Sequence, residues 1–187
     1  MTKAQIIELQ RQVGTTPDGF WGPKSTSAAQ RHLRSFMPKV SPWPASDSES
    51  LRRFYGDAGD ESVIVSVPAP PFLRLYDTGK KVTRIRCHHR VADSLLRALF
   101  DAHGKAPEVV SRYFGCFVNR NMRGGSKPSL HAYGAAIDLA ATGNGNRTHW
   151  PMRATMPIQV MEAFAREGWL SAGAFWSRDA MHFQATR

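Results

Sequence analysis

Four residues in two short stretches have the types and the spacing of a metal-dependent catalytic site. His131 and Asp138 lie in the first stretch, and Asp179 and His182 lie in the second. Two imidazoles and one carboxylate form a three-ligand set for Zn²⁺, which leaves the fourth coordination position open for water, as in catalytic zinc sites. Zinc lowers the pKa of that water toward neutrality, so that it becomes a nucleophile. We therefore predict that His131, Asp138 and His182 bind zinc. Asp179, just before His182, is the predicted general base.

The pattern S-x-H-x-x-G-x-x-x-D followed by D-x-x-H-F separates this site from an incidental group of histidines. A lone histidine is usually a surface or core residue, but here glycine, aspartate and both histidines fall at fixed offsets. The small residues between His131 and Asp138 suit a loop that carries the histidine and a buried strand over 135–140 that carries the aspartate. Gly134 allows the backbone to turn or to approach closely there. Burying Asp138 in an apolar strand is costly without a partner, and a metal ion removes that cost.

Together these residues resemble the zinc D-Ala-D-Ala carboxypeptidase and L-alanoyl-D-glutamate endopeptidase family, the VanY/VanX-like peptidases. The first family motif is matched by Ser129, His131, Gly134, Ala136 and Asp138, and the second by Asp179 and His182. The resemblance covers roughly residue 45 to the end of the chain. It implies hydrolysis of an amide bond in the peptide stem of peptidoglycan, with zinc polarising the scissile carbonyl and Asp179 passing a proton to the leaving amine.

The same resemblance implies residues that contact the substrate. The segment 119–124 resembles the family's segment with a substrate-facing arginine, so Arg120 is predicted to support the developing oxyanion or to anchor a substrate carboxylate. Arg123 is the alternative for this role, and a solvated surface arginine is the alternative for either. Further predicted substrate-binding residues are Ser129, Tyr133 and Trp176. A serine hydrolase is disfavoured, because no separate base accompanies Ser129.

The composition indicates a basic globular protein whose charge alone does not identify its partner. The 187 residues suffice for one medium and one small domain, and 42% of them are hydrophobic. The net charge of +10 comes from Lys and Arg scattered along the chain, which fits nucleic acid, an anionic membrane surface or a polyanionic cell wall. No nucleic-acid-binding motif is visible, so the predicted metal site favours the wall. We expect peptidoglycan as the partner, no nucleic acid, and a monomer.

Other sequence features exclude a membrane span and a disulfide framework. No apolar run approaches the ~20 residues that cross a bilayer, and residues 1–13 are an amphipathic polar segment instead of a signal peptide. Cys87 and Cys116 are able to pair, but free buried thiols are at least as compatible with the sequence. The run Cys87-His88-His89 is not a metal motif, because adjacent residues point in different directions and no CxxC accompanies it.

Residues 1 to about 37 have the pattern of two helices around a loop. Thr2 and Gln5 have capping-box spacing, and Pro23 is placed to open the second helix. The segment resembles the helical peptidoglycan-binding module of bacterial and phage wall hydrolases, through Asp18-Gly19-x-x-Gly22-Pro23-x-x-Thr26. The predicted wall-binding residues are Asp18, Gly19, Phe20, Trp21 and Gly22. The module's usual third helix is not evident, and a helical hairpin packed on the catalytic domain is the alternative.

The rest of the sequence predicts a Pro- and Ser-rich linker followed by strands and helices. Strands are expected over 62–67, 81–87 and 112–119, and helices over 91–104 and 157–164. Because these elements do not alternate regularly, we expect an α+β fold with a central antiparallel sheet. The expected domains are a helical peptidoglycan-binding module (1–40), a linker (41–50) and a zinc peptidase domain (51–187).

These predictions combine into a modular peptidoglycan hydrolase that resembles a phage endolysin. Such a protein accumulates in the host cytoplasm and reaches the wall through a membrane lesion, which agrees with the basic charge and with no signal peptide being evident. The first expected substrate bond is L-Ala–D-Glu, and D-Ala-D-Ala carboxypeptidase activity is the alternative. Two other classes stay open, a non-catalytic wall-binding protein with a vestigial zinc site and a basic nucleic-acid binder with salt-sensitive affinity.

Overall fold

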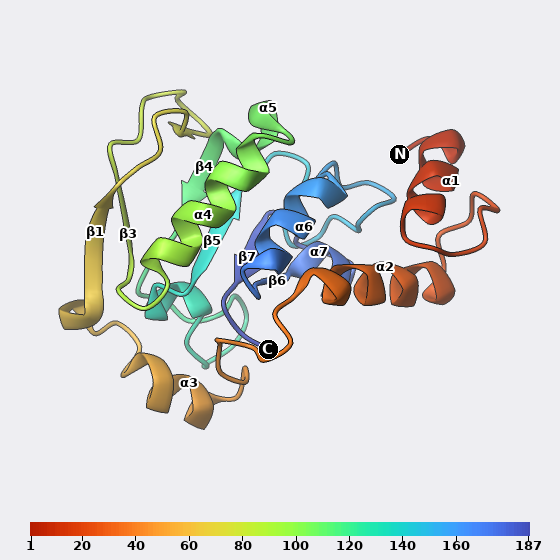
Figure 1. The fold of residues 1–187 in the computed structure, drawn as a ribbon. Helices are drawn as coiled ribbons and strands as arrows, with labels where there is room; N and C mark the ends of the chain where they lie inside the picture. Colours follow the sequence, from red (N-terminus) through yellow and green to blue (C-terminus); the bar gives the residue numbers. More distant parts are fainter.

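The structure is a computed structural model that describes residues 1–187 (Figure 1). Its α-helices are α1 (Lys3–Gln12), α2 (Pro23–Phe36), α3 (Ser48–Tyr55), α4 (Ala92–His103), α5 (Pro107–Val110), α6 (Ile158–Arg166) and α7 (Ala172–Trp176). Its strands are β1 (Ile64–Pro68), β2 (Arg74–Leu75), β3 (Arg84–His88), β4 (Arg112–Gly115), β5 (Ala136–Leu139), β6 (Leu170–Ser171) and β7 (His182–Gln184). Two 3₁₀ turns are η1 (Glu61–Val63) and η2 (Leu130–Tyr133). None of the helices combines the length and apolarity that a bilayer crossing requires.

A mixed five-stranded sheet forms the centre of the protein, with the strand order β2-β4-β5-β7-β6. Strand β2 runs parallel to β4, and the other neighbouring pairs of this sheet are antiparallel. Strands β1 and β3 form a separate antiparallel pair on the flank (Figure 1). The predicted α+β class is confirmed. The expected antiparallel arrangement holds except at β2, because the chain returns from β2 to β4 through a long crossover that includes α4 and α5.

Helices α4 and α6 lie side by side over one face of the central sheet (Figure 1). Buried residues of α4 recur at helical spacing, as in Leu95, Leu99 and Ala102. The ring of Phe164 on α6 stacks on Phe183 of β7, with the ring centroids 4.2 Å apart. Burying a side chain of this size contributes about 1.5–3 kcal/mol. The helices therefore cover one face of β7 and leave its other face for polar side chains.

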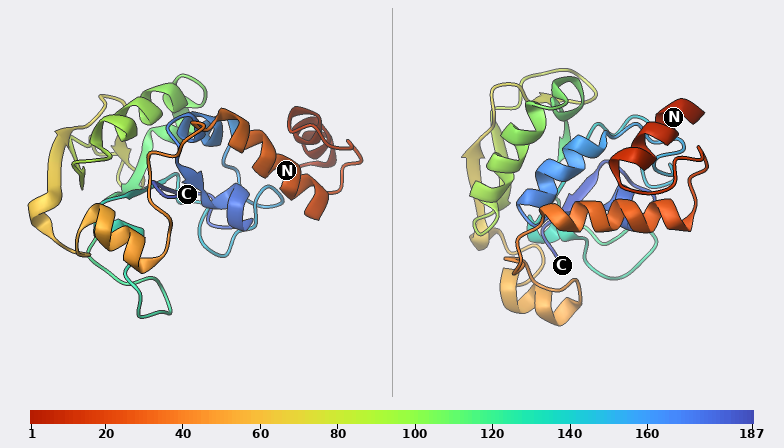
Figure 2. Two further views of the ribbon diagram at one scale, coloured as in Figure 1. Left: turned by 60° about the horizontal axis from the view of Figure 1, so that its bottom comes forward. Right: turned by 45° about the vertical axis from the view of Figure 1, so that its right-hand side comes forward.

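The N-terminal residues form the predicted pair of helices around a loop. The capping box of Thr2 and Gln5 is confirmed at the start of α1, and Pro23 occupies the first turn of α2. Helix α2 packs against α6 and α7 (Figure 2). Ala29 and Leu33 on its inner face are fully buried and belong to the same hydrophobic cluster as the core beside the sheet. The N-terminal hairpin, α1 and α2 with their loop, therefore shares its core with the rest of the chain.

The Pro- and Ser-rich segment after α2 is attached to the core. Trp43 is buried, and its Nε1 donates a hydrogen bond of 2.8 Å to the carbonyl oxygen of Glu167. Helix α3 begins inside the expected linker and was not predicted from the sequence. Only Leu51 and Tyr55 of α3 are buried, which is too sparse a pattern to indicate a helix without its surroundings.

The other predicted elements are present with shifted ends. The expected strands over 62–67, 81–87 and 112–119 correspond to β1, β3 and a shorter β4, and the expected helices correspond to α4 and α6. Cys87 and Cys116 are both free and buried. Of the two alternatives that the sequence allowed, a disulfide or two free buried thiols, the structure contains the free thiols.

Candidate metal centre

The central sheet brings the two predicted metal-binding stretches together on one face. Asp138 of β5 pairs with His182 of β7 in antiparallel register. Successive side chains of a strand point to opposite faces, and Phe183 packs on α6, so His182 and Gln184 point away from the helices. The Asp138 carboxylate reaches the His182 ring on that same side of the sheet. Strand pairing thus supplies two of the three candidate ligands.

His131 reaches this face from η2, immediately before β5. Ser129 caps η2, because its Oγ accepts a hydrogen bond of 3.4 Å from the backbone N–H of His131. Gly134 ends η2 with a φ of +64°, in the left-handed region that favours glycine. A Cβ at Gly134 would also lie 2.6 Å from the backbone nitrogen of His88. Glycine therefore lets η2 pack against β3 and turn directly into β5, which positions His131 beside Asp138.

Three side-chain atoms of these residues form a small cluster. Oδ1 of Asp138 lies 3.0 Å from Nδ1 of His182 and 3.3 Å from Nε2 of His131. The two ring nitrogens are 3.2 Å apart. Tetrahedral zinc with bonds of about 2.0–2.2 Å places neighbouring ligand atoms roughly 3.3–3.6 Å apart. The donor set of two imidazoles and one carboxylate therefore fits zinc in its chemistry, and its spacings of 3.0–3.3 Å lie at or just below the short end of that range.

Hydrogen bonds on the far side of each ring select the nitrogen that faces the cluster. Nδ1 of His131 donates to the carbonyl oxygen of Cys116 at 2.6 Å, so Nε2 is the ring nitrogen that faces Asp138 and that would offer its lone pair to a metal ion. Nε2 of His182 donates to Oε1 of Gln184 at 3.1 Å, so Nδ1 is the ring nitrogen that faces Asp138 and that would offer its lone pair to a metal ion. Metal-binding histidines usually donate their other N–H in this way, and the partner fixes the tautomer and the ring orientation.

Burial and neighbouring charges perturb both carboxyl groups of the site. Burial alone would raise the pKa of Asp138, but hydrogen bonds and charge from His131 and His182 outweigh it and hold that pKa well below its usual range. Asp138 is therefore an anion, the form that binds a cation. For Asp179, burial raises the pKa above its ordinary value, against the opposing charge of His182. Oδ1 of Asp179 is buried and has no hydrogen-bond partner within the protein.

These groups line a pocket of about 360 Å³. The predicted site residues that line it are Arg120, Arg123, Ser129, His131, Asp138, Trp176, Asp179 and His182. The polar lining residues that the sequence analysis did not identify are Asn146, Arg178 and Gln184. The apolar part of the lining is contributed mainly by Met122, Leu130, Ala172 and Met181. The pocket therefore joins a candidate metal site, a buried carboxylate and three arginines.

A comparison with protein families identifies the segment that carries most of this pocket. Residues 123–185 match the model of a peptidase M15 family described as D-alanyl-D-alanine carboxypeptidase. Residues 123–185 form a peptidase M15 domain. This family comprises zinc metallopeptidases, and the matched residues form a zinc metallopeptidase domain of this kind with a candidate metal site at His131, Asp138 and His182. No curated protein and no solved structure matches the chain.

The M15 domain contains the three candidate ligands and Asp179, whereas Arg120 lies outside the matched residues. Gln184 is the missed residue with the clearest sequence signal. It follows His182 by two positions in a strand, and residues i and i+2 of a strand share a face. Asn146 lies in a turn and Arg178 in an isolated β-bridge with His149, so no local sequence period indicates that they face the pocket.

Tyr133 is a predicted substrate-binding residue that the structure does not bring to the pocket. It lies at the end of η2, and its ring packs near Tyr55 with the centroids 6.4 Å apart. The side chain of His131 in the same turn points into the cluster instead. A turn of this kind spreads its side chains in different directions, so neighbours in sequence do not share a site.

The predicted wall-binding residues lie in the loop between α1 and α2, away from the pocket. Asp18 organises the loop by accepting hydrogen bonds from Nε2 of Gln10 and from the backbone N–H of Phe20, both at 2.8 Å. The side chain of Phe20 is 73% exposed. Trp21 instead packs edge-on against Trp150, with the centroids 5.4 Å apart. Phe20 is therefore available to a partner, whereas Trp21 is a packing contact.

Proposed function

We propose that the protein is a zinc-dependent endopeptidase that cleaves the L-Ala–D-Glu bond of the peptidoglycan stem. The M15 domain assigns the broader class, a hydrolase that acts on peptidoglycan peptides. The observation that carries the proposal is the placement of Asp179. Its unpartnered, buried Oδ1 belongs to the same pocket as the three candidate ligand atoms, where a proton acceptor is needed.

Each residue of the centre has a distinct role in this proposal. Nε2 of His131, Oδ1 of Asp138 and Nδ1 of His182 would hold the zinc ion. When bound, zinc would supply polarisation of the scissile carbonyl and a lowered pKa for a water molecule. Asp179 accepts a proton from the attacking water and delivers it to the leaving amine as the amide bond breaks. Burial raises the pKa of Asp179, which strengthens it as a proton acceptor.

The three arginines of the pocket suit an anionic substrate. Arg120, Arg123 and Arg178 take part in none of the ion pairs of the protein. The D-Glu residue on the leaving side of the L-Ala–D-Glu bond keeps a free carboxylate, which a guanidinium binds through its planar fork. We assign Arg120 to the developing oxyanion or to a substrate carboxylate, with Arg123 as the alternative. Ser129 and Trp176 line the same pocket and are proposed to contact the substrate.

A D-Ala-D-Ala carboxypeptidase is the second candidate, because the matching family model carries that description. In that reaction the pocket arginines would bind the terminal carboxylate of the substrate instead of the D-Glu carboxylate. The two activities leave different products. Cleavage of L-Ala–D-Glu creates a new amino terminus at D-Glu, and carboxypeptidase action releases free D-Ala.

Mass spectrometry of the products from purified peptidoglycan, with and without a chelator, separates these candidates. We expect new amino termini at D-Glu that disappear with the chelator and return with Zn²⁺. His182→Ala is the matched control, because it removes one ligand and should lose both zinc and activity. Free D-Ala as the sole product would transfer the assignment to the carboxypeptidase. A protein that binds zinc and wall but releases neither product would be a wall-binding protein without activity.

We further propose that the protein is a phage endolysin, acting from the host cytoplasm on the wall after release. In this proposal residues 1–40 bind the wall, 41–50 are a linker and 51–187 are catalytic. The net charge of +10 and the exposed Phe20 support binding to a polyanionic, glycan-rich surface. Phe20→Ala should reduce co-sedimentation with purified wall and leave cleavage of a soluble stem peptide unchanged. Tight DNA binding without wall affinity would contradict this assignment.

A further inference from the structure

Helix α7 and the turn after it form one wall of the pocket, through Ala172, Trp176, Arg178 and Asp179. Ser177 and Asp179 both have a φ of 58°, in the left-handed region that side chains other than glycine rarely adopt. Such residues persist only where the surrounding structure holds them, and they often mark functional sites. The position of the candidate base therefore depends on contacts that hold this wall.

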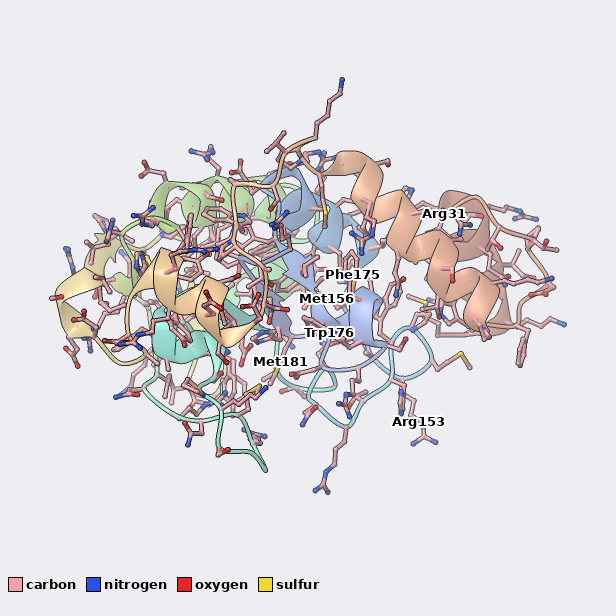
Figure 3. The ribbon with its side chains drawn as sticks, turned by 90° about the horizontal axis from the view of Figure 1, so that it is seen from below. Arg31, Arg153, Met156, Phe175, Trp176 and Met181 are labelled. Carbon is pink, nitrogen blue, oxygen red and sulfur yellow. The ribbon has the colours of Figure 1, made fainter.

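Helix α7 depends on α2 for its last hydrogen bonds. It spans five residues, and no side chain caps its N-terminus. The last carbonyl groups of any helix lack intrahelical donors. Nε2 of Gln30 on α2 donates to the carbonyl oxygens of Ala174 at 3.2 Å and Phe175 at 3.4 Å. The Arg34 guanidinium lies over the Phe175 ring, 5.0 Å from its centroid. In Figure 3, Phe175 and Trp176 project from the end of α7, next to α2.

The loop of the N-terminal hairpin supports the other end of the same wall. Trp21 packs edge-on against Trp150. The backbone N–H of Trp150 donates to the carbonyl oxygen of Ser177 at 3.0 Å, directly within the left-handed turn. The hairpin therefore contacts α7 through α2 and reaches the turn through Trp150.

Glu162 of α6 attaches the hairpin itself. Its Oε1 accepts a hydrogen bond of 3.0 Å from Nε2 of Gln12 and lies 2.7 Å from Nε2 of His32. The side chain of Glu162 is only 12% exposed, so both contacts are largely shielded from water. Helices α1 and α2 are thereby joined to the helix that packs on the central sheet, which makes the hairpin a firm support for α7.

We propose that the N-terminal hairpin is a positioning element of the peptidase site. Gln30 and Arg34 act as positioning residues that hold α7, so that Trp176 and Asp179 face the candidate ligands. The inference rests on the proposed function, because it concerns turnover in the same pocket. A positioning role for the hairpin differs from a wall-binding role in one measurable respect. Positioning affects every substrate equally, whereas wall binding affects only the insoluble wall.

The test compares the full-length double variant Gln30→Ala/Arg34→Ala with wild type on a soluble stem peptide and on intact wall. We expect kcat/KM to fall at least tenfold on both substrates with zinc affinity retained, because displacement of a positioned group by about 1 Å can reduce the rate ~100-fold. Arg31→Ala is the matched control, since Arg31 is exposed on the same helix (Figure 3) and should have no effect. Arg34→Lys keeps the cation over Phe175 and should retain most of the activity that Arg34→Ala loses.

Acrylamide quenching of Trp176 gives a readout that does not require turnover. Its signal is obtained as the difference between each protein and the same protein with Trp176→Phe. We expect quenching to rise in the double variant, as α7 loses its support. Unchanged quenching, or a loss of activity confined to intact wall, would overturn the positioning role. If wild type cleaves neither substrate, the proposed function fails, and the quenching result still decides the positioning role.

Discussion

His182 and Gln184 lie two residues apart on β7, and Nε2 of the histidine donates to Oε1 of the glutamine at 3.1 Å. Nε2 of Gln184 donates in turn to Oγ1 of Thr186 at 2.5 Å, so the amide oxygen is directed at His182. This arrangement turns Nδ1 of His182 toward Asp138, 3.0 Å away. Gln184 therefore determines how His182 presents its lone pair, although it is not itself a ligand.

Replacing Gln184 should weaken zinc binding without removing a ligand. Gln184→Ala leaves Nε2 of His182 without its acceptor, and loss of such a partner typically lowers metal affinity about 10–100-fold. Competition with a chromophoric chelator measures the change. Gln184→Glu keeps an acceptor at the same place and should bind zinc at least as well as wild type. Equal zinc affinity in Gln184→Ala and wild type would show that the tautomer is fixed by other contacts.

Asp179→Asn should separate proton transfer from metal binding. The amide keeps the size of the side chain but no longer accepts a proton, so kcat should fall roughly 10²–10⁴-fold, the usual contribution of a general base. Zinc content, measured by elemental analysis, should stay equal to wild type, because Asp179 is proposed as base and not as ligand. Loss of zinc in this variant would instead identify Asp179 as a ligand.

The candidate site was predictable where it depends on local spacing. His131 and Asp138 are joined by a short turn in which Gly134 adopts a positive φ. The glycine itself is visible in the sequence and indicates the turn. Gln30 instead contacts Ala174, which lies 144 positions away in the chain, and Trp150 contacts Ser177, which is also distant in sequence. No sequence period indicates contacts of this kind. The residues that hold the pocket wall were therefore missed, although most of those that line it were found.

In the fold, the long elements were predictable from the sequence and the shortest ones were not. Helices α1, α2, α4 and α6 have apolar periods that tertiary contacts reinforce, and Thr2 and Pro23 also mark the starts of α1 and α2. Helix α7, with five residues, and strands β2 and β6, with two residues each, are too short to show a period. They form because neighbouring strands and α2 supply their hydrogen bonds, and such partners are known only once the chain has folded.

His88 should make the stability of the protein depend on pH. It is buried with Nε2 donating to the carbonyl oxygen of Tyr55 and Nδ1 accepting from the backbone N–H of Arg90, so the neutral ring satisfies both partners. Burial lowers the pKa of His88 to about 4, from an ordinary value of 6.5. Between these values the unfolded chain binds the proton and the folded protein does not. The contribution of His88 to the free energy of unfolding is therefore complete above pH 6.5 and is lost as the pH falls toward 4.

Urea unfolding of wild type and His88→Gln across this pH range tests the expectation. Glutamine can still donate to Tyr55 but does not titrate, so the variant should be less stable than wild type near pH 7.5, chosen as roughly one unit above the ordinary histidine pKa. The difference in the free energy of unfolding should shrink as the pH falls from 6.5 to 4. Taking the difference cancels the titration of the other histidines. A difference that stays constant with pH would contradict the role of His88.

Leu33→Ala should destabilise the whole protein in one step. Leu33 is fully buried in the core that α2 shares with the sheet, and truncation of a buried leucine costs about 2–5 kcal/mol. Because the core is shared, loss of helical circular dichroism and release of zinc should occur together, at a lower urea concentration than in wild type. Arg31→Ala on the exposed side of α2 should stay within about 0.5 kcal/mol of wild type. An early helical transition with zinc release unchanged would show that the hairpin unfolds as an independent module.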